Sequence, residues 1–405
     1  MQKSDKTKIV IIGGGYAGLK ALQNLCKDPK YEITLIDKNA YHFMQTDVYD
    51  LIANEYDFAQ VCVDLFTYCT GFKNEVTFLK QEVKNVDFNN KKVITDSQRI
   101  TYDYLVIAVG AQTKFVSSIS GLKEFGHGIK ALNRAMYFKQ KFEMSLFQKI
   151  DKEGSYCKPL SIVIAGAGLS GVEIAAQMAS FAKDFYEQNH FLCRKLSIVL
   201  INSSEHILKG LDKYLVECSE KHLEELAVII KNNVRVESLT ESHVTLNNGE
   251  ILEMDFMIFT GGIEPNGVVA NLKLSKNKFG FLEINEYLQS VDYEDVFIVG
   301  DCSTLYDQDN NKLPPTADIA EQMGTLAAKN IRKMEKKKQL LKSRIKQRGI
   351  LIALGRNYAC GKVYGIYLKG CIAHLMKKSI EKIHLYFLDR QSKKGCKKIF
   401  CTPQD

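Results

Sequence analysis

Short apolar runs that end in glycine recur along the chain and predict buried parallel strands. Residues 8–12 and 161–165 are two such runs, and each is followed by a G-x-G-x-x-G motif and a helical pattern. Two later apolar runs, 101–110 and 254–262, also end in glycine. The separation is 97 residues from Gly13 to Gly110 and 95 residues from Gly166 to Gly261. Because matching motifs recur at nearly equal spacing, the pattern predicts two similar nucleotide-binding modules in an α/β chain.

The glycines of each motif suit a bound pyrophosphate. The first allows a tight turn, the second lets the backbone approach the phosphates, and the third lets the helix pack close to its strand. The phosphates then lie on backbone N–H groups at the positive end of a helix. Asp37 ends the predicted strand 33–37 about 20 residues beyond the first motif, where a ribose hydroxyl is expected. The alternative for Asp37 is a solvated carboxylate at a strand end.

A further strand and helix are predicted late in the chain. Residues 295–301 form a short apolar run that ends in Gly300 and Asp301. Pro314 and Pro315 then precede a run with helical spacing. Taken alone, Asp301 suits a turn or a helix N-cap as well as a ligand contact.

The C-terminal region is predicted to be helical and amphipathic. Residues 329–348 form a lysine-rich stretch with helical character. Beyond it, six apolar residues share one helical stripe: Tyr364, Leu368, Cys371, Ile372, Leu375 and Met376. Lys377 and Lys378 fall outside the stripe, and Lys382 interrupts it, so a bend or a second short helix is expected there. An apolar face with a cationic rim is typical of a helix lying in a membrane surface, and core packing or dimerisation is the alternative.

Charge is unevenly distributed along the chain. Residues 331–405 carry 20 Lys and Arg against 4 Asp and Glu, whereas the remaining 330 residues carry 35 basic and 43 acidic side chains. An acidic body with a basic tail indicates an acidic partner, either nucleic acid or an anionic membrane. No nucleic-acid-binding module is visible, and no stretch approaches the roughly 18 apolar residues of a spanning helix. We therefore expect peripheral binding to an anionic membrane surface and no nucleic-acid partner.

Cysteine content and the N-terminal region bear on the compartment. The chain has 11 Cys, an odd number, with no C-x-x-C pair. This pattern predicts a reducing environment without a disulfide framework or a structural metal site. The first apolar run is too short and too interrupted by glycine for a signal peptide.

The four glycine-ended segments, in this order, resemble the two-dinucleotide-binding-domain flavoproteins over residues 8–330. The resemblance implies two Rossmann-like domains, the second inserted in the first, with FAD bound by the first and a nicotinamide nucleotide by the second. The implied divisions are 1–114 with 263–330 for FAD, 115–262 for NAD(H), and 331–405 for a basic amphipathic membrane-association region.

Within that superfamily the chain is similar to type II NADH dehydrogenases. Four passages carry the similarity: 40–43, 170–173, 314–317 and 354–359. The resemblance implies an NADH:quinone oxidoreductase that passes a hydride from NADH to FAD and two electrons to a membrane quinone without pumping protons. It also implies peripheral attachment to the cytoplasmic face of the inner (cell) membrane. The sequence is compatible with a homodimer.

The resemblance assigns site residues to each ligand. For FAD they are Gly13, Gly15, Tyr16, Ala17, Gly18, Asp37, Lys38, Val83, Ala108, Gly110, Asp301 and Ala317. For NADH they are Gly166, Gly168, Leu169, Ser170, Gly171, Glu173, Asn202 and Gly262. Glu173 and Gln322 are the catalytic candidates, with Asp318 and Gln322 at the quinone. The alternative for Glu173 is a carboxylate that complements the helix dipole.

Two departures from the family pattern stand out. Asp318 replaces the first of two glutamines that border the flavin and quinone. Asn202 replaces an acid that binds the NADH ribose, and an amide binds a hydroxyl more weakly than a carboxylate does. Residues 203–205 offer no Arg for a 2′-phosphate, so NADH is favoured over NADPH.

Two other functions are weighed against quinone reduction by NADH. A disulfide reductase is excluded because no Cys lies between Asp37 and Asp57, where the reactive pair is expected. A sulfide:quinone oxidoreductase stays open because Cys157 and Cys302 fall near cofactor segments, although a small buried Cys is the commoner explanation. A non-enzymatic flavin and NADH redox sensor is the third hypothesis, motivated by the two departures.

Overall fold

Two parallel sheets form the centre of the molecule. The computed structural model describes residues 6–152, 159–188 and 196–400. The first sheet has the order β20-β9-β1-β2-β5. Its strands are β1 (Thr7–Ile12), β2 (Tyr31–Asp37), β5 (Val76–Lys80), β9 (Tyr104–Ile107) and β20 (Val296–Ile298). Helix α1 (Tyr16–Leu25) connects β1 to β2, as the first glycine motif predicts.

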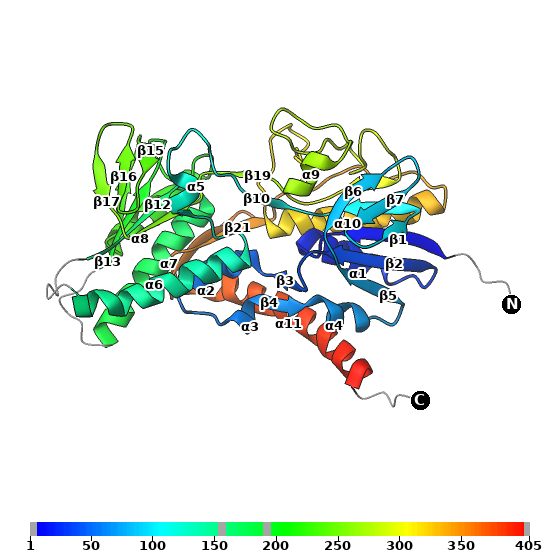
Figure 1. The fold of residues 1–405 in the computed structure, drawn as a ribbon, viewed down its shortest axis with the longest axis horizontal. Coiled ribbons are helices and arrows are strands. Elements are labelled where there is room, and N and C mark those ends of the chain that lie inside the picture. Colours follow the sequence, from blue (N-terminus) through cyan, green and yellow to red (C-terminus); the bar gives the residue numbers. More distant parts are fainter. Residues whose placement is uncertain (1–5, 153–158, 189–195, 401–405) are drawn as a thin grey trace.

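The second sheet repeats this arrangement at the other end of the molecule (Figure 1). Its order is β11-β18-β12-β13-β14. The strands are β11 (Gly126–His127), β12 (Leu160–Ala165), β13 (Leu196–Ile201), β14 (Ile229–Lys231) and β18 (Phe256–Phe259). Helix α7 (Leu169–Gln188) follows β12 as α1 follows β1. Strands β10 (Ala111–Thr113) and β19 (Ile263–Pro265) pair antiparallel and link the two halves.

The return of the chain to its first sheet supports the expected insertion. Strand β20 pairs with β9 after the whole second sheet has been completed. We therefore keep the division into 1–114 with 263–330 and 115–262 as a proposal.

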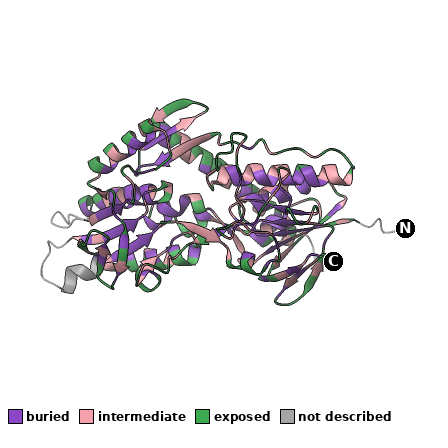
Figure 2. Ribbon diagram, turned by 90° about the horizontal axis from the view of Figure 1, so that it is seen from above, coloured by how far each residue is buried: buried purple, intermediate pink, exposed green. Residues whose placement is uncertain are grey.

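Shorter elements surround the two sheets. The minor strands are β3 (Tyr41–Phe43), β4 (Cys62–Asp64), β6 (Val83–Asp87), β7 (Lys92–Thr95), β8 (Arg99–Thr101), β15 (Val236–Leu239), β16 (His243–Leu246) and β17 (Ile251–Glu253). The helices are α2 (Val48–Ile52), α3 (Phe58–Val61), α4 (Leu65–Thr70), α5 (Leu122–Phe125), α6 (Leu132–Lys152), α8 (Lys213–Glu225) and α9 (Gly267–Asn271), with a 3₁₀ turn at Gln45–Asp47. Figure 2 shows the central strands buried and the exposed residues on the outer helices and loops.

The lysine-rich stretch 329–348 is not one helix, which corrects the sequence-based expectation. Helix α10 (Ala317–Glu335) ends before Lys337, whose φ of 49° is left-handed. Residues 338–348 are not helical. The side-chain nitrogen of Asn330 donates to the carbonyl of Leu341 at 3.0 Å, and its side-chain oxygen accepts from the backbone N–H of Leu341 at 2.8 Å. These bonds hold the non-helical segment 338–348 against α10.

The predicted apolar stripe is also divided between two kinds of structure. Strands β21 (Gly349–Ala353), β22 (Ala359–Val363) and β23 (Ile366–Lys369) form an antiparallel sheet. Tyr364 lies in the turn between β22 and β23 and Leu368 lies in β23, so neither belongs to the helix. Both turn residues, Tyr364 and Gly365, have positive φ, which favours a tight hairpin.

A single long helix, α11 (Gly370–Phe400), completes the described chain. Lys382 is exposed and does not interrupt it, which corrects the expected bend. Figure 1 shows α11 in red, running beside α4. The two helices approach so closely at Gly395 that a side chain there would collide with the carbonyl of Thr67.

An ordinary surface helix buries its apolar side and exposes its charged side, whereas α11 buries charged residues and exposes large apolar ones. Its inner face is charged and includes Lys377, Lys378 and Glu381, the last only 8% exposed. Its outer face carries large apolar side chains that are each more than half exposed: Ile372, Leu375, Ile380, Ile383, Tyr386 and Phe387. Within the described ranges, no helix has the length and apolar character needed to cross a bilayer.

Candidate functional site

The first glycine motif forms a tight loop between β1 and α1. Gly13 has a φ of +106°, and a side chain there would collide with the carbonyl of Ala108. A side chain at Gly18 would collide with the carbonyl of Gly13, so this position lets α1 pack closely. By contrast, a Cβ at Gly15 meets no atom within 4 Å. Gly15 lines a large cavity, which leaves the backbone there open to a ligand.

Asp37 stands at the end of β2 and faces the same loop. Its carboxylate accepts hydrogen bonds from the backbone N–H groups of Gly14 and Asn39, each at 2.7 Å. Burial raises the pKa of Asp37, and the two N–H groups oppose that increase by stabilising the charged form. The structure therefore brings the predicted acid to the glycine loop.

The cavity has a volume of about 1180 Å³ and lies beside the first sheet. Most predicted FAD residues line it: Gly13, Gly15, Tyr16, Ala17, Asp37, Lys38, Val83, Ala108, Gly110 and Asp301. Gly18 and Ala317 do not line the cavity, but Ala320, one turn further along α10, does.

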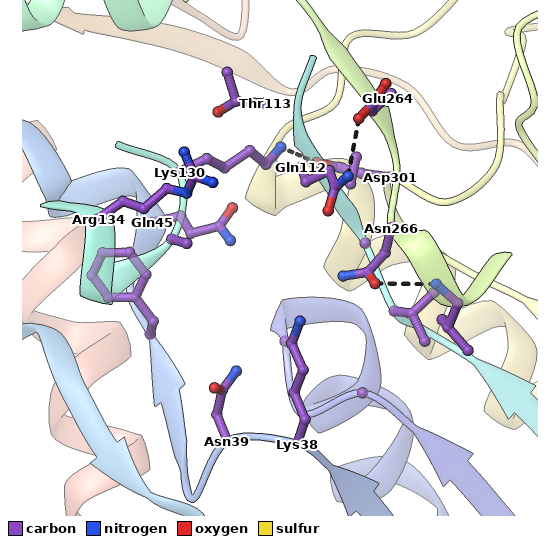
Figure 3. Close-up of a pocket in the computed structure, with 18 of the residues that line it drawn as sticks. Lys38, Asn39, Gln45, Gln112, Thr113, Lys130, Arg134, Glu264, Asn266 and Asp301 are labelled. Carbon is purple, nitrogen blue, oxygen red and sulfur yellow. Dashed lines mark hydrogen bonds and ion pairs between the residues drawn. The ribbon is translucent and has the colours of Figure 1, made fainter. Parts of the chain in front are cut away.

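Asn39, Gln112 and Lys130 also line the cavity and were not predicted. Figure 3 shows Lys38 and Asn39 at one end and Lys130, Gln112 and Asp301 at the other. Lys130 forms a 2.9 Å ion pair with Asp301. Its segment lies between β11 and α6, where no motif marks it, so sequence reasoning had no signal for it.

The cavity fits a flavin dinucleotide. It combines an open glycine loop at a helix N-terminus with a carboxylate at the end of the neighbouring strand. These groups match the needs of a pyrophosphate and a ribose. Gln112, Asn266 and Lys130 add donors further along.

The second glycine motif repeats the geometry of the first. Gly166 has a φ of +110°, close to that of Gly13, and a side chain at Gly171 would collide with the carbonyl of Gly166. A Cβ at Gly168 meets no atom within 4 Å, as at Gly15. Thr260 donates its hydroxyl to the carbonyl of Gly166 at 2.8 Å, a contact that the sequence did not reveal. Leu169 and Ser170 begin α7 beside this loop, and Gly262 has open space around it.

Comparison with known proteins agrees with this paired arrangement. The model of the pyridine nucleotide-disulphide oxidoreductase family matches residues 7–324. The chain belongs to this family.

Individual relatives of this oxidoreductase cover nearly its whole length. A type II NADH:quinone oxidoreductase from Staphylococcus saprophyticus is 27% identical over 384 residues, covering 93% of this chain and 94% of the relative. The structure of NDH2 from Plasmodium falciparum in complex with NADH has a TM-score of 0.83 at 18% identity and covers 98% of both chains. The sulfide:quinone oxidoreductase from Aquifex aeolicus has a TM-score of 0.80 at 20% identity, covering 97% of this chain and 95% of that one. These structures establish the fold of the oxidoreductase.

Asn202 of the oxidoreductase is committed to internal hydrogen bonds. Its amide nitrogen donates to the Ser204 carbonyl at 2.9 Å and to the side chain of Asn232 at 2.8 Å. The residue is 6% exposed. Asn202 therefore stabilises the loop after β13, and its role toward a ribose stays a prediction.

Glu173 lies away from the cavity, in a group of buried charges between α2, α7 and α11. Its carboxylate accepts hydrogen bonds from the backbone N–H of Ala353 at 3.1 Å and from Nζ of Lys377 at 3.0 Å. Burial raises the pKa of Glu173, and Lys377 opposes the increase. We call the whole group the charge cluster: Asp47, Asp50, Glu173, Lys377, Lys378 and Glu381.

The charge cluster corrects the expected position of two lysines. Lys377 and Lys378 were expected on the cationic rim of a membrane-surface helix, but their side chains are 13% and 15% exposed. Lys378 lies 2.5 Å from Asp50 and 3.4 Å from Glu381. Part of the basic tail therefore binds acids of the chain's own body, because a buried charge needs a partner of opposite sign.

Asp318 and Gln322 lie one turn apart on α10 and contact each other. The amide nitrogen of Gln322 donates to the carboxylate of Asp318 at 2.9 Å and to the carbonyl of Lys346 at 3.0 Å. Arg348 lies 3.6 Å from the other oxygen of Asp318. The structure brings these residues together and joins both to the non-helical segment after α10.

Eight cysteines lie within the described residues, and each is a free thiol there. Cys302 is fully buried, and its thiol contacts the carbonyls of Val299 and Ile107. Burial raises its pKa to about 12, so it is a poor nucleophile. Cys157 lies outside the described residues. Among those residues, no group of three or more His, Cys, Asp or Glu side chains has the arrangement of a metal site.

Proposed function

We propose that this chain is an NADH:quinone oxidoreductase that passes a hydride from NADH to FAD and then two electrons to a quinone. The observation that carries the proposal is the pair of matched glycine loops, one of which opens into a cavity of flavin size. The relatives named type II NADH:quinone oxidoreductase, which match 93% of the chain, support the same reaction.

In this proposal the first module holds FAD. The open backbone at Gly15 and the N-terminus of α1 bind the pyrophosphate, and Asp37 accepts a hydrogen bond from a ribose. Asp301 and Lys130 bind polar groups further along the cavity. The flavin supplies the two-electron chemistry, while the protein orients it and limits water access.

The second module is proposed to hold NADH. The open backbone at Gly168 and the N-terminus of α7 bind its pyrophosphate as the first module binds that of FAD. Asn202 contributes indirectly, by fixing the loop that follows β13. Glu173 lies outside the cavity, at the beginning of α7, where Lys377 balances its charge, and its catalytic role is kept as a proposal.

The quinone is proposed to bind near α10. Ala320 of this helix lines the flavin cavity, and Asp318 and Gln322 occupy neighbouring turns. The Gln322 nitrogen already donates to Asp318 and to the Lys346 carbonyl, so the oxygen of the Gln322 amide would accept a hydrogen bond from a hydroxyl of the quinol product.

The outer face of α11 is proposed to rest on an anionic membrane surface. Large apolar side chains cover this face, and Lys382, Arg390, Lys393 and Lys394 are exposed on the same helix. Apolar residues that enter the lipid interface beside cations that contact headgroups favour such binding. A lipid-soluble quinone would then reach the protein from the membrane. We further propose that attachment is to the cytoplasmic face of the cell membrane and leave a homodimer as a compatible assembly.

Sulfide oxidation is the weaker alternative. It requires reactive thiols beside the flavin, and the buried Cys302 has the wrong environment for one. A non-enzymatic redox sensor requires that the reduced protein persist in the presence of quinones.

Anaerobic rapid mixing distinguishes these functions. Purified flavoprotein is mixed with NADH, and the reduced protein is then mixed with a short-chain quinone. We expect bleaching of the flavin by NADH and its recovery with quinone. Reduction by sulfide but not by NADH would favour the alternative, and slow reoxidation by every quinone would favour the sensor.

A further inference from the structure

A hydrogen-bonded chain runs from the cofactor cavity into the charge cluster. Tyr16 lines the cavity, and its hydroxyl lies 2.9 Å from Oγ1 of Thr46. Thr46 in turn donates to Oδ1 of Asp47 at 2.9 Å. Each hydroxyl both donates and accepts, so a proton can move along such a chain in either direction.

We propose that Tyr16, Thr46 and Asp47 form a proton relay between the charge cluster and the cavity. The relay deepens the proposed reaction and rests on it, since quinone reduction by NADH consumes a proton. NADH supplies one proton and two electrons as a hydride, whereas the quinol carries two protons. One further proton must therefore come from solvent in each turnover.

The transfer balances at every atom. The O–H bond of the Asp47 carboxyl breaks as a new one forms on Thr46, and the former Thr46 proton passes to Tyr16. The proton that Tyr16 held then leaves for the group being reduced in the cavity. Asp47 regains a proton from solvent through the charge cluster, where the side chains of Lys377 and Lys378 are 13% and 15% exposed.

Asp47 is suited to act as the donor. It is 1% exposed, and its carboxylate does not cap the helix that begins at the next residue. An aspartate at an N-cap normally accepts a hydrogen bond from the first turn of its helix. Here the carboxylate instead meets the hydroxyl of Thr46, so the usual structural role does not account for its position.

The surroundings of Asp47 keep it protonated near neutral pH. Burial raises its pKa to about 8, and Glu381 of α11 and Asp50 of α2 add to the increase. Thr46 and Lys377 oppose it. Tyr49 of α2 lies nearby and donates to Glu381 at 3.2 Å.

Other charged groups of the cluster face these neighbours. Glu173 of α7 pairs with Lys377, and Gln177 of α7 donates to Asp50, which also pairs with Lys378. On the Tyr16 side, the rings of His42 and His384 lie 4.9 Å and 5.4 Å from the tyrosine ring. Burial lowers the pKa of His42 to about 4, which keeps that ring neutral, so the carboxyl is the proton source in the chain.

Three variants of the flavoprotein test the relay: Tyr16→Phe, Thr46→Val and Asp47→Asn. Thr46→Val is the most informative because it keeps the side-chain shape and leaves Asp47 in place. We expect each variant to slow single-turnover quinone reduction by about 100-fold, a typical contribution of positioned proton transfer. Two substitutions combined should slow it no more than one, since all three break the same chain. Tyr68→Phe removes another buried hydroxyl, outside the cavity, and should leave the rate unchanged.

A second readout does not depend on turnover. Infrared spectra of aspartate-labelled protein report the protonated carboxyl, and the Asp47→Asn variant identifies its band. Chemical reduction of the bound flavin with dithionite should shift the titration of this band in the wild type but not in Thr46→Val. An identical shift in both proteins, or a wild-type quinone-reduction rate and pH profile in Thr46→Val, overturns the relay. Failure of the wild type to reduce any quinone overturns the proposed function instead, and the dithionite titration then decides the relay by itself.

Discussion

The Nζ atom of Lys377 lies 3.0 Å from Oε1 of Glu173, which ties α11 to the beginning of α7. These residues are about 200 positions apart in the chain, and both side chains are largely buried. Lys377 also lies 3.5 Å from Glu381 on its own helix. The C-terminal helix is thus held to the second module through a cation shared by two carboxylates.

Replacing Lys377 by Met should strongly destabilise the protein, because Glu173 and Glu381 would lose their shared partner. Removing one partner of a buried pair typically costs about 3–5 kcal/mol of unfolding free energy. Urea unfolding measures the loss, and adding Glu173→Gln should recover part of it. Lys393→Met breaks an exposed pair with Asp389 and should have little effect. Equal losses in the two single variants would contradict the interpretation.

Two glycines of the first motif should respond to alanine in opposite ways. Gly18→Ala forces a methyl group against the Gly13 carbonyl, so we expect a large loss of thermal stability or failure to fold. Gly15→Ala meets no protein atom within 4 Å, so the fold should survive while the methyl group enters the cavity. Thermal unfolding and flavin content of the purified proteins separate the two effects. Full flavin content in Gly15→Ala would place the cofactor elsewhere.

Asp37→Asn should weaken FAD binding while preserving the fold. The variant loses a charged acceptor, and hydrogen bonds to charged groups contribute about 1.5–3 kcal/mol, which corresponds to roughly 10-fold to 100-fold in affinity. Fluorescence titration of the flavin-free protein measures this change. Asp103 also accepts a backbone N–H, from Lys8 at 2.7 Å, but lies outside the cavity. Asp103→Asn should therefore retain the wild-type affinity, and an equal loss there would refute the assignment.

The raised pKa of Asp47 predicts how stability varies with pH. The folded protein holds this proton up to about pH 8, whereas an unfolded aspartate releases it near 3.8. Between these values the folded state binds more protons, so the contribution of Asp47 to the free energy of unfolding falls as pH rises. Asp47→Asn removes this decrease. Urea titrations should show the variant gaining stability relative to the wild type as the pH approaches 8, and parallel pH curves would contradict the shift.

Replacing Tyr386 and Phe387 by Ser should release the protein from anionic vesicles without loosening the fold. Their side chains are 59% and 58% exposed, so little packing is lost. Burying one large apolar side chain contributes about 1.5–3 kcal/mol, so the double variant should bind at least about ten-fold more weakly. Ile251→Ser, at a 63% exposed site on β17, serves as the control. Vesicle co-sedimentation measures the difference, and unchanged binding by the double variant would reject the membrane role.

Truncation after Lys329 is a poorer test of membrane binding than these substitutions. It would cut α10 within its helix and remove β21, β22 and β23 together with α11. Loss of Lys377 would also leave Glu173 unpaired. Release from vesicles would then be indistinguishable from partial unfolding.

The glycine loops and the acid at the end of β2 were predictable because they depend on local constraints. A left-handed φ at Gly13 and Gly166, and close helix packing at Gly18 and Gly171, leave a pattern within a few residues. Buried strands likewise leave short apolar runs. These features allowed the positions of both sheets to be inferred from sequence.

The charge cluster and the hairpin before α11 could not be predicted in the same way. Periodicity identified an apolar and a cationic side of the C-terminal region, but it could not show that Lys378 meets Asp50, more than 300 residues earlier. Alternating and helical patterns are also difficult to separate over a few residues, which is why Leu368 was assigned to the helix instead of β23. The ion pair between Asp301 and Lys130 likewise joins residues far apart in the sequence, so no local pattern could reveal it.

That pairing has a consequence for how the two modules are joined. Asp301 follows the last strand of the first sheet, while Lys130 follows the edge strand of the second. A cofactor that binds Asp301 must share the carboxylate with Lys130 or take it over. Cofactor affinity and the mutual orientation of the modules are then thermodynamically coupled, and each changes the other by the same free energy. Binding of a cofactor at Asp301 would therefore also change the free energy of this contact between the two modules.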